Sequence, residues 1–129
     1  MLSEAEIETL TGVAGLMIPA SEAYGVPGAD DSAIMPEIIV SAERTEDAVR
    51  NALAAFAEVG DSSFQQSHPD EAAVLQTIVA SCYYRDARVL VSLGRKPQPP
   101  FPEGHEMEEG DFSLLDPVRA RGEIWRKVD

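Results

Sequence analysis

Residues 17–31 read MIPASEAYGVPGADD, and this stretch separates the first helix of the chain from the second. Pro19 cannot donate a backbone hydrogen bond and disfavours helical geometry at Ile18, so a helix that arrives from the N-terminal side must end here. Gly25 and the pair Pro27-Gly28 favour turns. The stretch is therefore predicted to be a loop that bends at several points.

A short amphipathic helix is predicted before this loop. Ser3 and Glu6 have the spacing of a capping box, and apolar residues recur at three- and four-residue intervals as far as Met17. Gly12 and Gly15 weaken the helix by roughly 1 kcal/mol each relative to alanine, so packing must hold it. Close approach of another backbone is the expected reason for both glycines.

Two more helices are predicted after the loop. Asp30 and Asp31 offer acceptors to the free N–H groups of a helix that ends near Glu43 and has a proline in its first turn. The Thr45 hydroxyl is predicted to cap the next helix, which ends at Gly60.

The next part of the chain alternates polar and apolar stretches. Residues 61–67 are polar and are predicted to form a connection, with Phe64 turned back onto the core. A helix is predicted to open at residues 68–71, where a proline and two acids suit a first turn. A break is expected at residues 83–86, followed by a last short helix that stops at Gly94. The thiol of Cys82 lies in an apolar pattern and is predicted to be a buried core group.

The composition agrees with this helical pattern. The chain has 129 residues, of which 44% are hydrophobic but only 6% aromatic, and alanine supplies much of the apolar fraction. That balance suits closely packed helices better than a strand-rich core. The predicted fold is all-α: a small helical body over residues 1–94 and an extended, proline-rich C-terminal tail over residues 95–129.

The predicted tail contains five of the nine prolines between Pro97 and Pro117, together with many acids. Only a short helix starting at Asp116 fits there, limited by Gly122. The tail also carries large apolar residues at irregular spacing, which a purely solvated linker would not need. A segment of this kind is expected to lie across a surface, either of its own domain or of a partner.

The charge of the chain excludes some classes of partner. A formal net charge of −13 repels nucleic-acid phosphates and anionic lipid surfaces. No segment reaches membrane-spanning length, so no membrane insertion is expected. The residues after Met1 show no basic region followed by an apolar run, so a cytoplasmic location is expected. A periplasmic location would require that a signal was removed or that a partner carries one.

The residues that usually carry chemistry are sparse. His68 and His105 are the only histidines, and they do not have the spacing of metal ligands. No Gly-x-Ser-x-Gly elbow surrounds a serine, and the glycines form neither a dinucleotide-binding pattern nor a P-loop. Paired acids such as Asp30-Asp31 are explained as helix starts or solvated loops. No catalytic, cofactor-binding or metal site is therefore predicted in this chain.

Two short sequence motifs near the N-terminus are Met17-Ile18-Pro19-Ala20 and Gly25-Val26-Pro27-Gly28-Ala29-Asp30. They follow a short predicted helix and precede further predicted helices and a proline-rich tail. In this order, the motifs resemble the gluconate 2-dehydrogenase subunit 3 family. These motifs cover roughly the first quarter of the chain. The resemblance implies an all-α partner of a large glucose-methanol-choline (GMC) type oxidoreductase, in which the partner holds the FAD and this chain supplies no catalytic residue.

The expected function is therefore that of a non-catalytic small subunit that stabilises the large subunit of a FAD-dependent sugar, glycoside or alcohol dehydrogenase. The residues expected to contact the large subunit are Tyr24, Val26, Pro27, Phe101, Phe112, Leu114, Leu115 and Trp125. Two alternatives remain open at this point. One is a free-standing acidic helical adaptor or regulatory protein, and the other is a small enzyme whose acids act on a bound sugar.

Overall fold

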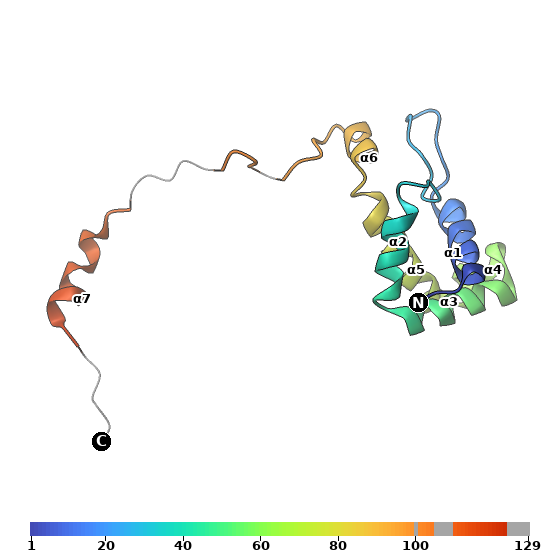
Figure 1. The fold of residues 1–129 in the computed structure, drawn as a ribbon, viewed down its shortest axis with the longest axis horizontal. Helices are drawn as coiled ribbons and strands as arrows, with labels where there is room; N and C mark the ends of the chain where they lie inside the picture. Colours follow the sequence, from blue (N-terminus) through green and yellow to red (C-terminus); the bar gives the residue numbers. More distant parts are fainter. Residues whose placement is uncertain (100, 105–109, 124–129) are drawn as a thin grey trace, which may run out of the picture. The chain divides into compact units, whose positions relative to one another are not determined.

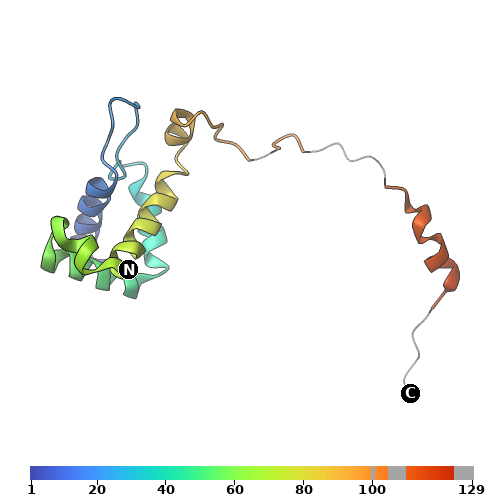
Figure 2. The same cartoon turned by 180° about the vertical axis from the view of Figure 1, so that it is seen from behind.

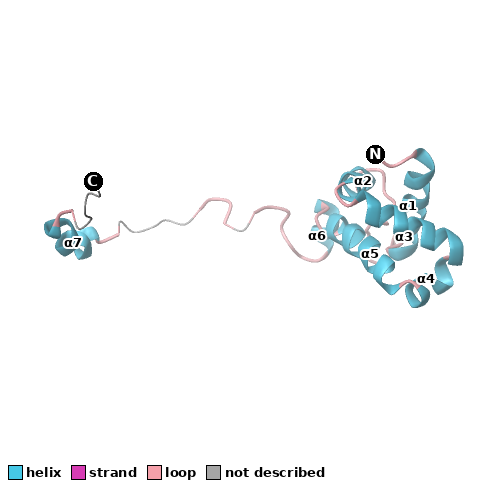
Figure 3. Ribbon diagram, turned by 90° about the horizontal axis from the view of Figure 1, so that it is seen from below, coloured by secondary structure: helices cyan, strands magenta, loops and turns pink. Residues whose placement is uncertain are grey.

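The computed structural model describes residues 1–99, 101–104 and 110–123 of this chain. The chain divides into two units, Met1–Pro97 and Gln98–Asp129. Every regular element of the described residues is helical, apart from one isolated β-bridge (Figure 1, Figure 3). The predicted all-α class is confirmed. The elements are α1 Glu4–Met17, α2 Met35–Glu43, α3 Glu46–Val59, α4 Asp61–Ser67, α5 Pro69–Tyr83, α6 Ala87–Ser92, the 3₁₀ helix η1 Phe112–Leu115 and α7 Asp116–Arg121.

Helix α1 begins and ends where the sequence predicts. The Glu6 N–H donates to the Ser3 hydroxyl at 3.3 Å, and the Glu6 carboxylate accepts from the Ser3 N–H at 2.7 Å, which confirms the capping box. The prediction that another backbone comes close to both glycines is wrong, because a side chain approaches Gly15 and no atom approaches Gly12. A Cβ on Gly15 would come within 2.9 Å of the Asp30 carboxylate, whereas a Cβ on Gly12 would meet no atom within 4 Å. Gly12 therefore faces open space, and no neighbour explains it.

The starts of α2 and α3 differ from the predicted caps. Ile34 occupies the N-cap of α2, because a hydrogen-bonded turn separates the two acids from the helix, and Asp31 accepts from the Ala33 N–H at 2.9 Å within that turn. The Thr45 hydroxyl makes no capping bond, since its backbone ψ of 45° departs from the extended geometry of a capping residue. The predicted end of α3 at Gly60, whose φ is +71°, is confirmed.

The predicted connection over residues 61–67 is wrong, because these residues form α4. The prediction that Phe64 turns back onto the core is confirmed: its side chain is 4% exposed and meets the Phe56 ring edge-on at a centroid distance of 5.4 Å. Local propensity is weak here. Burial of Phe64 between α3 and α5 supplies the stabilisation that the polar residues around it do not.

Helix α5 is the centre of the first unit and contacts α2, α3 and α4, while α1 packs against α3 (Figure 2). Its side chains Leu75, Val79 and Cys82 are almost fully buried, so the predicted core thiol is confirmed. The predicted break after α5 is also present. Asp86 starts α6, where its carboxylate accepts from the N–H groups of Arg88 and Val89, the second and third residues of the helix.

The second unit contains η1 and α7 among its described residues. Asp111 caps η1, where its carboxylate accepts from the Ser113 N–H at 3.0 Å. Helix α7 starts at Asp116 and stops before Gly122, whose φ is +69°, so the predicted short helix is confirmed. No helix of the described residues in either unit is long and apolar enough to cross a membrane.

Candidate functional site

The loop between α1 and α2 forms a small hairpin that rises from one end of the helices in both views (Figure 1, Figure 2). We call residues 18–29 the hairpin. Ser21 and Val26 exchange two backbone hydrogen bonds of 3.0 and 3.1 Å, and the Ala29 N–H donates to the Ile18 carbonyl at 2.9 Å. At the tip, Gly25 has a φ of +62° and closes a turn back to Glu22. The predicted multiple bends are therefore organised by backbone pairing.

The base of the hairpin is held against the helices by a buried tyrosine. The Tyr83 hydroxyl, at the end of α5, donates to the Pro27 carbonyl oxygen at 2.8 Å. Tyr83 is 4% exposed, and burial raises the pKa of its phenol. The bond joins positions 56 residues apart in the chain. It satisfies the one polar atom of an otherwise apolar buried side chain.

Gly28 lets the two arms of the hairpin base come together. A Cβ at this position would lie 2.9 Å from the Ala20 backbone nitrogen and 3.2 Å from the Ile18 carbonyl oxygen, and it would also touch the Asp30 carboxylate. Any residue larger than glycine would push these strands of backbone apart. The pair Pro27-Gly28 predicts a turn, and the structure adds this packing requirement at Gly28.

An ion network fixes the segment that leaves the hairpin. The Arg88 guanidinium, in the first turn of α6, lies 2.7 Å from Asp31 and 3.1 Å from Asp86. Hydrogen bonds from Arg88 are the main cause that lowers the pKa of both carboxyls, and Asp86 and Asp31 in turn raise the pKa of Arg88. All three groups are partly solvated, so the network orients the chain more than it stabilises it.

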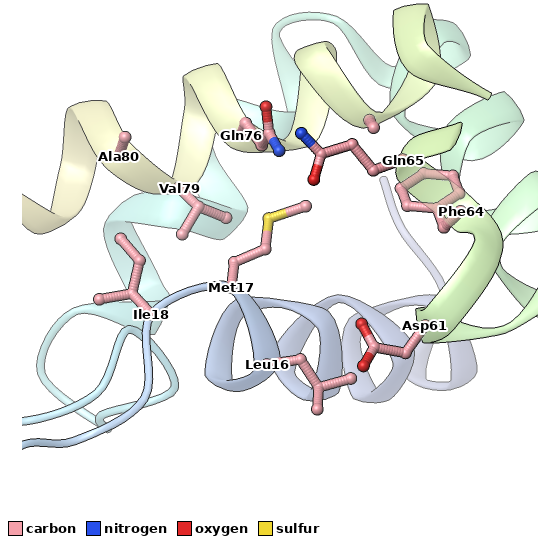
Figure 4. Close-up of a pocket in the computed structure, with 10 residues that line it drawn as sticks. Leu16, Met17, Ile18, Asp61, Phe64, Gln65, Gln76, Val79 and Ala80 are labelled. Carbon is pink, nitrogen blue, oxygen red and sulfur yellow. The ribbon is translucent and has the colours of Figure 1, made fainter. Parts of the chain in front are cut away.

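A groove of about 420 Å³ opens between the end of α1, α4 and α5 (Figure 4). Its floor and walls are mainly apolar, with Met17 and Ile18 on one side and Val79 on the other. The amide groups of Gln65 and Gln76 point toward one another across it (Figure 4). Ile18 belongs both to this groove and to the hairpin, so the two features adjoin.

The predicted contact residues of the hairpin have different environments. Tyr24 is 78% exposed at the tip, whereas Val26 and Pro27 are half-buried and serve the hairpin base. Only Tyr24 therefore presents a large free side-chain surface. Val26 and Pro27 hold the tip in place, a role that no local sequence pattern indicates.

The predicted contact residues of the second unit are exposed wherever the structure describes them. Phe101 and Phe112 are about two thirds exposed, Leu114 is 81% exposed and Leu115 is 46% exposed. The last three lie on η1 and share one short helical segment. Trp125 lies outside the described residues.

No group of three or more His, Cys, Asp or Glu side chains with the geometry of a metal site occurs in the part of the chain that the structure describes. His68 lies at the start of α5, where its ring stacks obliquely on Phe64 and its Nδ1 lies 3.9 Å from Glu71. His105 lies outside the described residues. The strongest arrangements of polar groups lie around Arg88, which pairs with Asp31 of the connection before α2, and around Arg50, which pairs with Glu6 of α1 and Glu46 of its own helix; both face solvent.

Sequence reasoning missed two residues that shape this region. The sequence pattern places Tyr83 only at a helix break and predicts no role for Arg88. Neither has a local signal, because the partners Pro27 and Asp31 are more than 50 residues away along the chain.

Comparison of this chain with protein-family models, with curated proteins and with solved structures found no match, so its family is not shown by similarity.

Proposed function

We propose that this chain is a non-catalytic small subunit that binds and stabilises a large FAD-dependent dehydrogenase subunit of the GMC type, acting on sugars, glycosides or alcohols. The FAD and the catalytic residues belong to the large subunit. The choice of partner class is supported by residues 17–20 and 25–30, which resemble the gluconate 2-dehydrogenase subunit 3 family.

The observation that carries the proposal is the exposure of large apolar side chains outside the helical core. Phe112, Leu114 and Leu115 follow one another within four residues and are between 46% and 81% exposed. Clustered apolar side chains of this size are typical of protein contacts, since aromatic and large aliphatic groups supply most of the energy of an interface.

The stabilising action follows from linkage. A chain that binds only the folded large subunit raises that subunit's stability by about 2.7 kcal/mol when its free concentration is 100 times Kd. Retention of FAD increases with it if the bound chain favours the closed form of the FAD-binding region. No proton or electron transfer is assigned to this chain.

The proposal is tested by purifying the tagged full-length chain from its native source, identifying the co-purified chain by mass and recording the flavin absorbance. A yellow complex with a much larger GMC-type chain is the expected result. Replacing Phe112 and Leu114 by serine should lower the yield of the complex, whereas the matched replacement of Val40, which is 55% exposed on α2, should not. A colourless, folded chain that purifies alone would overturn the proposal and favour the acidic adaptor.

A further inference from the structure

The hairpin combines an exposed tip with an ordered base. Tyr24 is 78% exposed, yet the residues on either side are fixed by the paired bonds between Ser21 and Val26 and by the bond from Ala29 to Ile18. A mobile loop that binds a partner loses conformational entropy, and a loop already held in its bound shape loses much less. The arrangement is that of a docking element formed in advance.

The body of the protein contributes directly to this order. Among the described residues, the bond from the Tyr83 hydroxyl to the Pro27 carbonyl is the only side-chain hydrogen bond that reaches the hairpin from a helix. Pro27 follows Val26, whose backbone pairs with Ser21. Loss of the Tyr83 hydroxyl would therefore loosen the base from which Tyr24 projects, although Tyr83 itself does not face solvent.

The side chain at the tip suits a pocket in another protein. Tyrosine offers a large flat apolar surface and one hydroxyl, and it loses few rotamers when it is fixed, which is why it is frequent among residues that dominate binding energy. It is flanked by Ala23 and Gly25, which add little bulk. A narrow apolar cleft can therefore accept it.

The negative charge around the hairpin indicates which charge the partner should carry at the rim of the cleft that accepts Tyr24. Residues 1–43 contain eight Asp or Glu and no Lys or Arg. Several of these acids are paired with arginines from later helices, such as Glu6 with Arg50 and Asp31 with Arg88, whereas Glu22 is exposed near the tip and makes no ion pair with any described residue. Complementary charge on a partner surface requires Lys or Arg beside the cleft.

We propose that the hairpin is a preformed docking element in which Tyr24 enters an apolar cleft of the large subunit, Glu22 faces a Lys or Arg at its rim, and Tyr83 is the positioning residue that holds the hairpin ready. The inference rests on the proposed function, because the cleft belongs to the large subunit proposed there. It adds a site that the apolar side chains of η1 do not provide.

The test is titration of the full-length chain against the separately purified flavin-containing large subunit, with Kd measured by calorimetry. Tyr24→Ala should weaken binding by at least about tenfold. Tyr83→Phe should weaken it by about three- to tenfold, the loss typical of one hydrogen bond. Tyr84→Phe is the matched control, because Tyr84 is a half-exposed neighbour with no hydrogen bond from its hydroxyl to any described residue, and its Kd should be unchanged.

A double-mutant cycle separates positioning from a general loss of stability. If Tyr83 acts through Tyr24, adding Tyr83→Phe to Tyr24→Ala should cause little further loss, whereas independent effects would multiply. Gly25→Ala provides a second perturbation of the tip that leaves the helical core untouched, because the φ of +62° disfavours a side chain, and it should also weaken binding. Unchanged binding by Tyr83→Phe, or multiplicative effects in the cycle, would overturn the positioning role.

The contribution of Glu22 to binding is tested separately, by the dependence of Kd on salt concentration. Glu22→Gln should reduce the dependence of Kd on salt concentration, and Glu58→Gln, an exposed acid on α3, should not. If wild-type chain and large subunit do not bind at all, both this inference and the proposed function fail. If they bind tightly and every hairpin variant binds equally well, the proposed function stands and this inference alone is overturned.

Discussion

Replacing Gly12 or Gly28 by alanine should change stability in opposite directions, although both glycines lie near the same loop. Gly12 is inside α1, and a Cβ there meets no atom within 4 Å. Alanine loses less backbone entropy than glycine when a helix forms, so Gly12→Ala should stabilise the protein by about 1 kcal/mol. For a unit of this size, that gain raises the thermal midpoint by about 4–8 °C.

Gly28→Ala should destabilise the protein. The new Cβ would lie 2.9 Å from the Ala20 nitrogen and 3.2 Å from the Ile18 carbonyl oxygen, both of which are backbone atoms that cannot rotate away. Comfortable non-bonded contacts are about 3.5–4.0 Å. Overpacking costs about 1–3 kcal/mol, and the smaller conformational entropy of the unfolded chain offsets about 0.4–1 kcal/mol of that cost. At the middle of both ranges, the net loss of stability is about 1.3 kcal/mol.

The assay is urea unfolding of the two variants and wild type, followed by far-ultraviolet circular dichroism. The expected order of midpoints is Gly12→Ala above wild type and Gly28→Ala below it, with equal slopes. A Gly28→Ala protein as stable as wild type would refute the close approach of the hairpin arms. A destabilised Gly12→Ala protein would refute the open environment of that glycine.

Three further changes test other parts of the structure. Arg88→Met removes the cation that lowers the pKa of Asp31 in the folded protein below its unfolded value near 3.8. The stabilisation that Arg88 gives through Asp31 is therefore full above pH 3.8 and is lost as the pH falls through the folded-state pKa. Urea unfolding should therefore separate wild type from Arg88→Met at neutral pH but not in strong acid. Ser3→Ala should cost about 1 kcal/mol through loss of the capping box, whereas Thr45→Ala should have almost no effect on the unfolding midpoint, because the Thr45 hydroxyl caps nothing. Phe64→Ala should cost about 3–5 kcal/mol in thermal unfolding, since its ring is 4% exposed, and a near-neutral result would show that α4 is not packed as described.

Most helices could be predicted from the sequence because their limits depend on local chemistry. The capping box at Ser3, proline at the start of α5 and the glycines after α3 and α6 each act within one turn of the helix they limit. Helix α4 could not be predicted in this way. Its residues have weak intrinsic preference for a helix, and the burial of Phe64 against two other helices outweighs that preference.

The candidate site could be predicted only in part. The exposed tip at Tyr24 and the apolar residues of η1 follow from turn chemistry and composition. The roles of Tyr83 and Arg88 could not be predicted from the sequence, because each depends on a partner brought near by the packing of α5 and α6. The capping predictions for Asp31 and Thr45 failed for a related reason: the connections before α2 and α3 turn more tightly than an extended cap.

The sequence by itself determined the all-α class, the placement of most helix ends and the acidic, apolar-tipped character of the exposed loop. These properties depend on residue chemistry within a few positions of the chain and on the period of the apolar pattern. Only the tertiary structure decided that the loop is a braced hairpin, that Gly28 is packed while Gly12 is open, and that α4 is a helix. Each of these depends on contacts between residues distant in the chain, and burial supplies the free energy that local preference lacks.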